Sequence, residues 1–136
     1  MESVEADSVD KKITILVVDD MKPMRNILSF SLRKYGYKVN VASKGYVALK
    51  YAFENNPLDL ILLDINMPDM DGYEILKKLR ESEVTKDIPI IFFTAEGQKK
   101  DIQKVIEAGV NDYVVKPFKF EDLHRRIEKL IGAKKR

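Results

Sequence analysis

Apolar and polar positions along this chain fall into blocks, and each block has the length of a strand or a helix. Five short apolar runs, rich in β-branched and aromatic residues, predict strands at 13–18, 39–42, 58–63, 88–93 and 112–115. Apolar residues with helical spacing predict helices near 23–35, 47–52, 73–82, 102–106 and 120–131. Strands and helices that alternate in this way predict a parallel sheet covered by helices on both faces.

The segment boundaries carry their own signals. Pro23 suits the first turn of a helix, and Gly36, Gly109 and Gly132 are expected to end helices. The third strand, 58–63, is apolar except for one aspartate, which is typical of a strand buried on both faces. With 136 residues and no linker, repeat or low-complexity block, the chain is expected to form one domain.

Polar side chains stand where the predicted strands end. Asp19 and Asp20 follow the first strand, Asp64 the third, Thr94 the fourth and Lys116 the fifth. Parallel strands place their carboxyl ends at one edge of the sheet, where ligands bind in folds of this class. We therefore expect these five residues to converge.

The chemistry of this set indicates a metal-assisted phosphoryl acceptor. Three carboxylates in one place repel one another, and a divalent cation relieves the repulsion. Oxygen ligands with room for water suit Mg²⁺. With Lys116 and Mg²⁺, the site would be close to neutral and could accept a phosphoryl group, to which Thr94 offers a hydrogen bond. Asp64 is the best-placed nucleophile and would become an acyl phosphate.

Taken one at a time, these residues have ordinary structural explanations. Asp19 and Asp20 could cap the following helix, Thr94 could be a strand-end hydroxyl, and Lys116 could form a simple ion pair. Four strands that end on three acids, a hydroxyl and a lysine favour the functional interpretation for the set.

The motifs DDMKPMRNI, DINMPDMDG, FFTAEGQKKDI and DYVVKPF carry a family resemblance. The chain from about Lys12 to Ala133 resembles the receiver domain of two-component response regulators, most of all the stand-alone CheY-like chemotaxis group. The resemblance implies a flavodoxin-like (βα)5 α/β fold, a doubly wound parallel sheet of order 2-1-3-4-5 with five helices. Residues 1–11 are expected to be a flexible tail, 12–133 the receiver domain and 134–136 a basic tail.

The resemblance also assigns roles to individual residues. Asp64 corresponds to the phosphorylated aspartate, and the residues implied as Mg²⁺ ligands are Asp19, Asp20, Asp64 and the backbone carbonyl of Asn66. Thr94 and Lys116 would contact the phosphoryl group, Thr94 and Tyr113 would be switch residues, and the Lys116–Pro117 bond is expected to be cis. Partner contacts are expected to include Lys99, Ile102 and Arg126.

The implied function is a signalling switch, not an enzyme beyond slow self-dephosphorylation. A histidine kinase would donate the phosphoryl group, and the output would be binding to a downstream target, in chemotaxis the flagellar switch. A phosphorelay intermediate is an alternative. An aspartate-nucleophile phosphohydrolase is less favoured, because that class carries a DxD motif after its first strand and has a cap domain.

Composition narrows the range of partners and sites. A net charge of +2 argues against nucleic acid, and the absence of a long apolar run argues against a membrane partner. The chain is expected to be a cytoplasmic monomer. A calcium loop at Asp64 is rejected because Pro68 and Asp69 occupy positions where that loop needs a ligand and a glycine. The single histidine, His124, is expected to be a surface residue with no acidic or nucleophilic partner in register.

Overall fold

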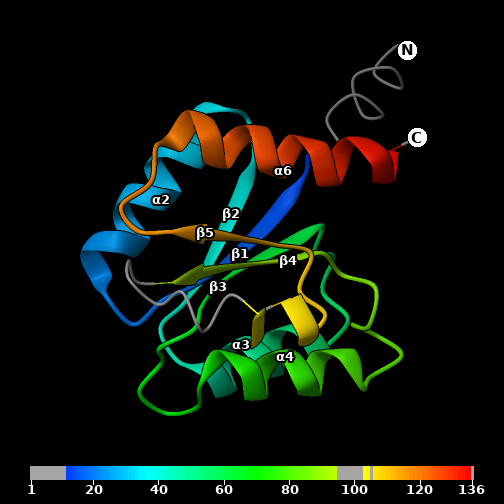
Figure 1. Ribbon diagram of the computed structural model, residues 1–136. Coiled ribbons are helices and arrows are strands. Elements are labelled where there is room, and N and C mark those ends of the chain that lie inside the picture. The colour runs from blue at the N-terminus through cyan, green and yellow to red at the C-terminus, as the bar shows by residue number, and fades with distance from the viewer. Residues whose placement is uncertain (1–11, 95–102, 105, 136) are drawn as a thin grey trace.

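The sheet has the predicted parallel topology. The computed structural model describes residues 12–94, 103–104 and 106–135. Its strands are β1 (Thr14–Val18), β2 (Lys38–Ala42), β3 (Leu60–Asp64), β4 (Ile90–Thr94) and β5 (Asp112–Val115). All pair in parallel in the order β2-β1-β3-β4-β5, so β3 lies at the centre of the sheet (Figure 1).

Four helices cover this sheet within the described residues, where five were expected. They are α2 (Lys22–Lys34), α3 (Gly45–Phe53), α4 (Gly72–Arg80) and α6 (Phe120–Lys135). The remaining predicted helix, near 102–106, falls partly outside the described residues, because 95–102 and 105 are not described. The described residues 103–104 and 106–107 have helical backbone. Helices α2 and α6 lie on one face of the sheet, and α3 and α4 lie on the other (Figure 1).

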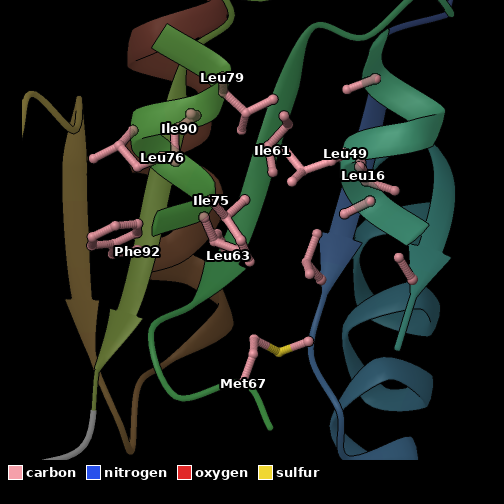
Figure 2. Close-up of a cluster of buried hydrophobic side chains, with 14 of the residues drawn as sticks. Leu16, Leu49, Ile61, Leu63, Met67, Ile75, Leu76, Leu79, Ile90 and Phe92 are labelled. Atoms are coloured by element: carbon pink, nitrogen blue, oxygen red, sulfur yellow. The ribbon is translucent and has the colours of Figure 1, made fainter. Parts of the chain in front are cut away.

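The two faces of the sheet form two separate apolar clusters. The cluster beneath α3 and α4 contains alternate strand residues and the inward faces of both helices (Figure 2). Among its members are Leu16, Leu49, Ile61, Leu63, Ile75, Leu76, Leu79, Ile90 and Phe92. The cluster beneath α2 and α6 takes the intervening strand positions, and includes Ile15, Val17, Leu28, Leu32, Leu60, Leu62, Ile91, Phe93, Leu123 and Ile127. Burial of both faces explains why the inner strands β1, β3 and β4 are almost continuously apolar, whereas the outer strand β2 contains Lys38 and Asn40.

Two strands, β3 and β4, begin later than their apolar runs predict, because a polar residue or a proline stands near the start of each run. β3 begins at Leu60 because Asp59, inside the apolar run, turns its carboxylate to the backbone N–H of Thr14, at 2.9 Å. β4 begins at Ile90, just after Pro89, which has no N–H for the ladder but whose carbonyl accepts from Ile61. The apolar pattern therefore places the start of these two strands two residues too early.

Two of the three predicted glycine stops are confirmed. Gly36 and Gly109 have φ angles of 93° and 89°, the left-handed conformation that favours glycine after a helix. The prediction for Gly132 is wrong, because α6 continues through it to Lys135. Ile127 and Ile131 are buried against the sheet, and their packing holds the last turns of the helix in place.

Gly132→Ala is expected to stabilise the protein by about 0.5–1 kcal/mol. Alanine restricts the unfolded chain and is the stronger helix former. A Cβ at this position would meet nothing within 4 Å, so no packing cost opposes the gain. Urea unfolding of the two proteins would measure the difference, and a lower midpoint for the alanine variant would contradict the helical assignment of this residue.

Candidate functional site

The carboxyl edge of the sheet gathers the strand-end residues. The registers pair Val18 with Leu63, Asp64 with Phe93 and Thr94 with Val115. The chain therefore leaves β1, β3 and β5 at nearly the same level, and the next residues after β1 and β5 are Asp19 and Lys116. The central position of β3 places Asp64 between them.

Three carboxylates converge at this edge. One ligand oxygen from each of Asp19, Asp20 and Asp64 lies within 4.8 Å of the others. Asp19 is fully buried and Asp64 is 5% exposed, whereas Asp20 is exposed. The pocket therefore has two desolvated acids at its base and a third acid at its opening.

Lys116 supplies positive charge to the two buried acids. Its Nζ lies 3.6 Å from Asp19 Oδ2 and 3.5 Å from Asp64 Oδ2, and its side chain is partly buried. The Lys116–Pro117 peptide bond is cis, as the sequence resemblance implies. One ammonium placed between two carboxylates leaves an excess of negative charge in the pocket.

Backbone groups orient one oxygen of each buried acid. The N–H of Met21 donates to Asp19 Oδ1 at 2.8 Å, and the N–H of Asn66 donates to Asp64 Oδ1 at 3.0 Å. Helix α2 has no side-chain cap, so the Asp19–Asp20 pair is not used to cap that helix. The other oxygens of Asp19 and Asp64 are left to face Lys116 and the centre of the pocket.

The donor set fits a hard divalent cation. Asp19 Oδ2 is buried and has no hydrogen-bond partner among the described residues, which is costly for a carboxylate oxygen. Neighbouring oxygens from Asp20 and Asp64, with no nitrogen or sulfur ligand, match the preferences of Mg²⁺. A cation bound to these oxygens would satisfy the orphaned atom and relieve the repulsion.

Burial dominates the protonation of Asp64. Burial raises the pKa of Asp64 above its ordinary value of 3.8. The Asn66 N–H and Lys116 act in the opposite direction, and the charge of Asp19 adds to the increase. Without a cation, the pocket therefore makes the ionised form of Asp64 less favourable than it is in water.

Several expected site residues are placed less fully. The backbone of Thr94 ends β4, but its side chain lies outside the described residues, as do Lys99 and Ile102. Asn66 is exposed next to Asp64, and Tyr113 is half-buried against the α3–α4 cluster. Arg126 is held by two acids, with Nη1 at 2.8 Å from Asp112 Oδ1 and Nε at 3.0 Å from Asp122 Oδ2.

Asp69 has a role that the sequence interpretation missed. It lies in the loop after β3, and its carboxylate accepts from the N–H groups of Gly45 and Tyr46, at 2.8 and 3.1 Å. These amides open α3, so Asp69 caps that helix from a distant part of the chain. No local spacing could indicate this contact. By contrast, the spacing of Asp71 and Glu74 is a capping signature, and Asp71 does accept from the Glu74 N–H.

Asp69→Ala is expected to destabilise the protein by about 1 kcal/mol at neutral pH, the typical cost of a lost helix cap. Burial raises the pKa of Asp69, but the Gly45 and Tyr46 N–H groups outweigh this, and the net pKa is below the ordinary 3.8. The ionised form is therefore favoured by folding, so the contribution is present above the ordinary value and lost as pH falls below it. Unfolding curves of both proteins across this pH range test the prediction, with Asp69→Asn as the control that keeps one acceptor.

The prediction that His124 has no acidic partner in register is wrong, because its Nε2 lies 3.9 Å from Oε1 of Glu128, one turn further along α6. Its ring stacks on Tyr35 with centroids 3.7 Å apart, and its Nδ1 lies 3.2 Å from the Tyr37 hydroxyl. Burial, followed by the nearby charge of Glu128, raises the pKa of Tyr37 to about 12. The histidine therefore ties α6 to the turn between α2 and β2, and its two tyrosine contacts come from residues too distant in sequence to be recognised by spacing.

Comparison with known proteins gives a consistent result. The family model described as the response regulator receiver domain matches residues 15–128. Chemotaxis protein CheY1 of Helicobacter pylori is 39% identical over 88% of this chain and 97% of its own length. Among solved structures, chemotaxis protein CheY4 of Vibrio cholerae has a TM-score of 0.81 and 33% identity over 88% of this chain and 98% of its own. The receiver domain of a Pseudomonas aeruginosa sensor histidine kinase, with a magnesium ion coordinated in its active site cleft, has a TM-score of 0.82 and 35% identity over 89% of this chain and 98% of its own.

Proposed function

Because this chain belongs to the response regulator receiver domain family, we propose that it is a signalling switch controlled by phosphorylation of Asp64. The observation that carries the proposal is the pocket itself, where Asp64 lies beside Asp19, Asp20 and Lys116. A stoichiometric change in one protein, rather than turnover of a diffusible substrate, is the expected activity.

The proposed reaction moves a phosphoryl group from a phosphohistidine of a kinase to Asp64. A carboxylate oxygen of Asp64 forms a bond to phosphorus, while the bond from phosphorus to the imidazole nitrogen breaks and its electron pair stays on that nitrogen. Lys116 lies 3.5 Å from Asp64 Oδ2, close enough to neutralise the oxygens that the group brings. We assign Thr94, at the end of β4, to a hydrogen bond with the same oxygens.

Mg²⁺ is the proposed cofactor. Asp19, Asp20 and Asp64 would hold it with their carboxylate oxygens, and we add the backbone carbonyl of Asn66 as a fourth ligand. When bound, the ion supplies positive charge to both the acids and the incoming phosphoryl oxygens. Asp19 Oδ2 supports this assignment, because it is buried and accepts no hydrogen bond in the described part of the chain, with only the ammonium of Lys116 nearby at 3.6 Å.

The proposed output is a change of surface near β5 and α6. Tyr113 lies on β5, which pairs with β4, and β4 in turn pairs with the strand that carries Asp64. Its side chain is half-buried. We propose that it moves when Thr94 moves. It lines a cleft of about 550 Å³ together with Lys119, Arg125 and Arg126. We propose that Tyr113 and Arg126 contact a downstream protein there, with Lys99 and Ile102 as further contacts.

The biological setting that we propose is chemotaxis, with a histidine kinase as donor and a flagellar switch protein as target. Similarity to CheY proteins over nearly their full length supports this choice. A phosphorelay intermediate is the second candidate, because receivers of sensor histidine kinases are also among the similar structures. No described helix has the length and apolar character needed to cross a membrane; we propose a cytoplasmic monomer.

Treatment with a small phosphodonor and Mg²⁺ tests the proposal. The wild-type protein is expected to gain one phosphoryl group by intact mass spectrometry, and Asp64→Asn is expected to gain none. Asp71→Asn is a matched control, because that acid caps α4 at the surface, and it should still be phosphorylated. Phosphorylation of Asp64→Asn, or of the wild type to the same extent in the presence of chelator, would contradict the assignment.

A further inference from the structure

A long stretch of this chain has only one sign of charge. From Met21 to Phe53 there are seven basic residues and no acidic residue, although the whole chain has a net charge of only +2. The rest of the chain is therefore net acidic. This stretch contains α2, β2 and α3, so the positive charge is concentrated at the β2 side of the molecule.

Part of this charge surrounds an open groove between α2 and β2. The groove has a volume of about 700 Å³. We call its lining the basic face, which consists of Lys22, Arg25, Asn26, Ser29, Phe30, Arg33, Lys34 and Val41. Four of these residues are basic and none is acidic. A neighbouring hollow is lined by Lys12, Arg33 and Lys38, and extends the positive surface along β2.

Apolar side chains lie among these charges. Phe30 is 67% exposed and Val41 is 47% exposed, which is unusual for large apolar groups near one another. Lys34 Nζ lies 5.3 Å from the centre of the Phe30 ring, so the ring is exposed within a cationic surrounding. A ligand of this face must therefore bring both negative charge and an apolar group.

The two arginines are already oriented by the backbone. Arg25 Nη1 donates to the carbonyl of Asp19 at 2.9 Å, and Arg33 Nη2 donates to the carbonyl of Val39 at 3.2 Å. A guanidinium has five N–H donors, so each retains donors for a carboxylate, at little further cost in side-chain entropy. Lys22 and Lys34 are exposed at either end of α2.

β2 is the outermost strand at this side of the described sheet. An outermost strand presents backbone groups that an extended polypeptide can use. Val41 lies on this strand beside the groove, so an extended segment lying along β2 would pass over Val41 and Phe30. The groove, the outermost strand β2 and the positive charge of this face all favour an extended, acidic polypeptide as the ligand.

We propose that the basic face is a docking surface for an acidic, extended segment of a partner protein. Its carboxylates would pair with Lys22, Lys34 and the two arginines, and an apolar side chain would pack on Phe30 and Val41. A second copy of this chain is disfavoured, because two identical basic faces repel each other. Nucleic acid is disfavoured because the net charge of the chain is small and the acids elsewhere oppose a long polyanion.

This surface is separate from the proposed phosphorylation-dependent one. The basic face lies at β2, and the cleft that contains Tyr113 lies at β5, on the opposite edge of the sheet. Binding at the basic face is therefore expected to be the same before and after phosphorylation. A failure here would leave the assignment of Asp64 unaffected, since the two are measured separately.

Fluorescence anisotropy with a labelled synthetic peptide tests the proposal. The peptide is rich in Glu and contains one Phe and one Leu, and it is titrated with the full chain. Lys22→Glu with Lys34→Glu is expected to weaken binding about tenfold, and Phe30→Ser by a similar factor. Raising the salt from about 0.05 M to about 0.5 M is expected to weaken binding several-fold.

Matched controls separate the basic face from charge in general. Lys77→Glu with Lys78→Glu changes two exposed lysines on α4, and Val84→Ser changes an exposed apolar residue elsewhere; both should bind as the wild type does. Phosphorylation of Asp64 should be normal in the Lys22, Lys34 and Phe30 variants, which shows that they fold.

Four results would overturn the proposal. The α4 control could weaken binding as much as the α2 variant. A single-stranded oligonucleotide of equal charge could bind more tightly than the peptide, with the same loss in Phe30→Ser. Sedimentation could show self-association that Phe30→Ser removes. Finally, a variant of the chain in which Glu2 and Glu5 are replaced by Gln, and Asp7 and Asp10 by Asn, could bind the peptide tenfold more tightly than the wild type. This result would show that the chain's own acidic residues compete with the peptide for the basic face.

Discussion

Gly72→Ala is expected to destabilise the protein by about 3 kcal/mol and to slow phosphorylation of Asp64. A Cβ on Gly72 would lie 2.7 Å from the Cα of Ile65 and 3.1 Å from the carbonyl oxygen of Asp64. Both atoms belong to the backbone, so no flexible side chain can move aside. The Gly72 N–H also donates to the Ile65 carbonyl at 2.7 Å, and the chain cannot separate without losing that bond.

Two measurements distinguish this effect from a general loss of helix stability. Urea unfolding gives the change in free energy, and the rate of phosphorylation by a small phosphodonor reports the position of the loop that follows Asp64. Gly132→Ala is the control, because its added methyl group meets nothing and should have the opposite effect on stability. A Gly72→Ala protein as stable as the wild type would show that α4 can move away from β3 at little cost.

Asp64→Asn is expected to make the metal-free protein more stable at neutral pH, by about 1 kcal/mol, although we expect it to abolish phosphorylation. The carboxylate of Asp64 is buried beside that of Asp19, and burial raises its pKa above 3.8. Asparagine is neutral and still offers an oxygen to the Asn66 N–H. The variant therefore removes the cost of a desolvated charge and keeps the loop hydrogen bond.

The pH dependence gives this prediction a sharper test. Because the pKa of Asp64 is raised by folding, the folded wild type binds that proton more tightly than the unfolded chain does. Its contribution to stability is therefore full below the ordinary value and lost as pH rises through the raised pKa. The advantage of Asp64→Asn should appear only at the higher pH. A variant less stable than the wild type at neutral pH, without metal, would show that Lys116 more than compensates for the buried charge.

The sequence was sufficient for the sheet and for the pocket because both depend on local signals. Continuous apolar runs define strands buried on both faces, and the residues that follow them must meet where parallel strands end. Asp19, Asp64 and Lys116 could therefore be placed together from their positions alone. The sheet order was available through the family resemblance, and the observed topology matches it.

The features that escaped prediction are contacts between distant residues. Asp69 bonds to α3 across 24 sequence positions, and His124 contacts Tyr37 across 87. Neither separation corresponds to a helix or strand period, so no sequence pattern indicates these contacts. The prediction that Gly132 ends a helix was wrong for a related reason. The preference of glycine for helix ends is local, and the packing of Ile127 and Ile131 against the sheet overrides it. Tertiary contacts decided each of these cases.

The bond from Asp69 to α3 has a consequence for the direction of signalling. The stretch after Asp64 is fastened at two points, to α3 through Asp69 and to the start of α4 through Asp71. Because both hydrogen bonds hold this loop, it has little freedom to change conformation when Asp64 is modified. Phosphorylation of Asp64 should therefore cause conformational change mainly on the side of Lys116 and β5. The helix cap formed by Asp69 would in this way determine which part of the protein changes.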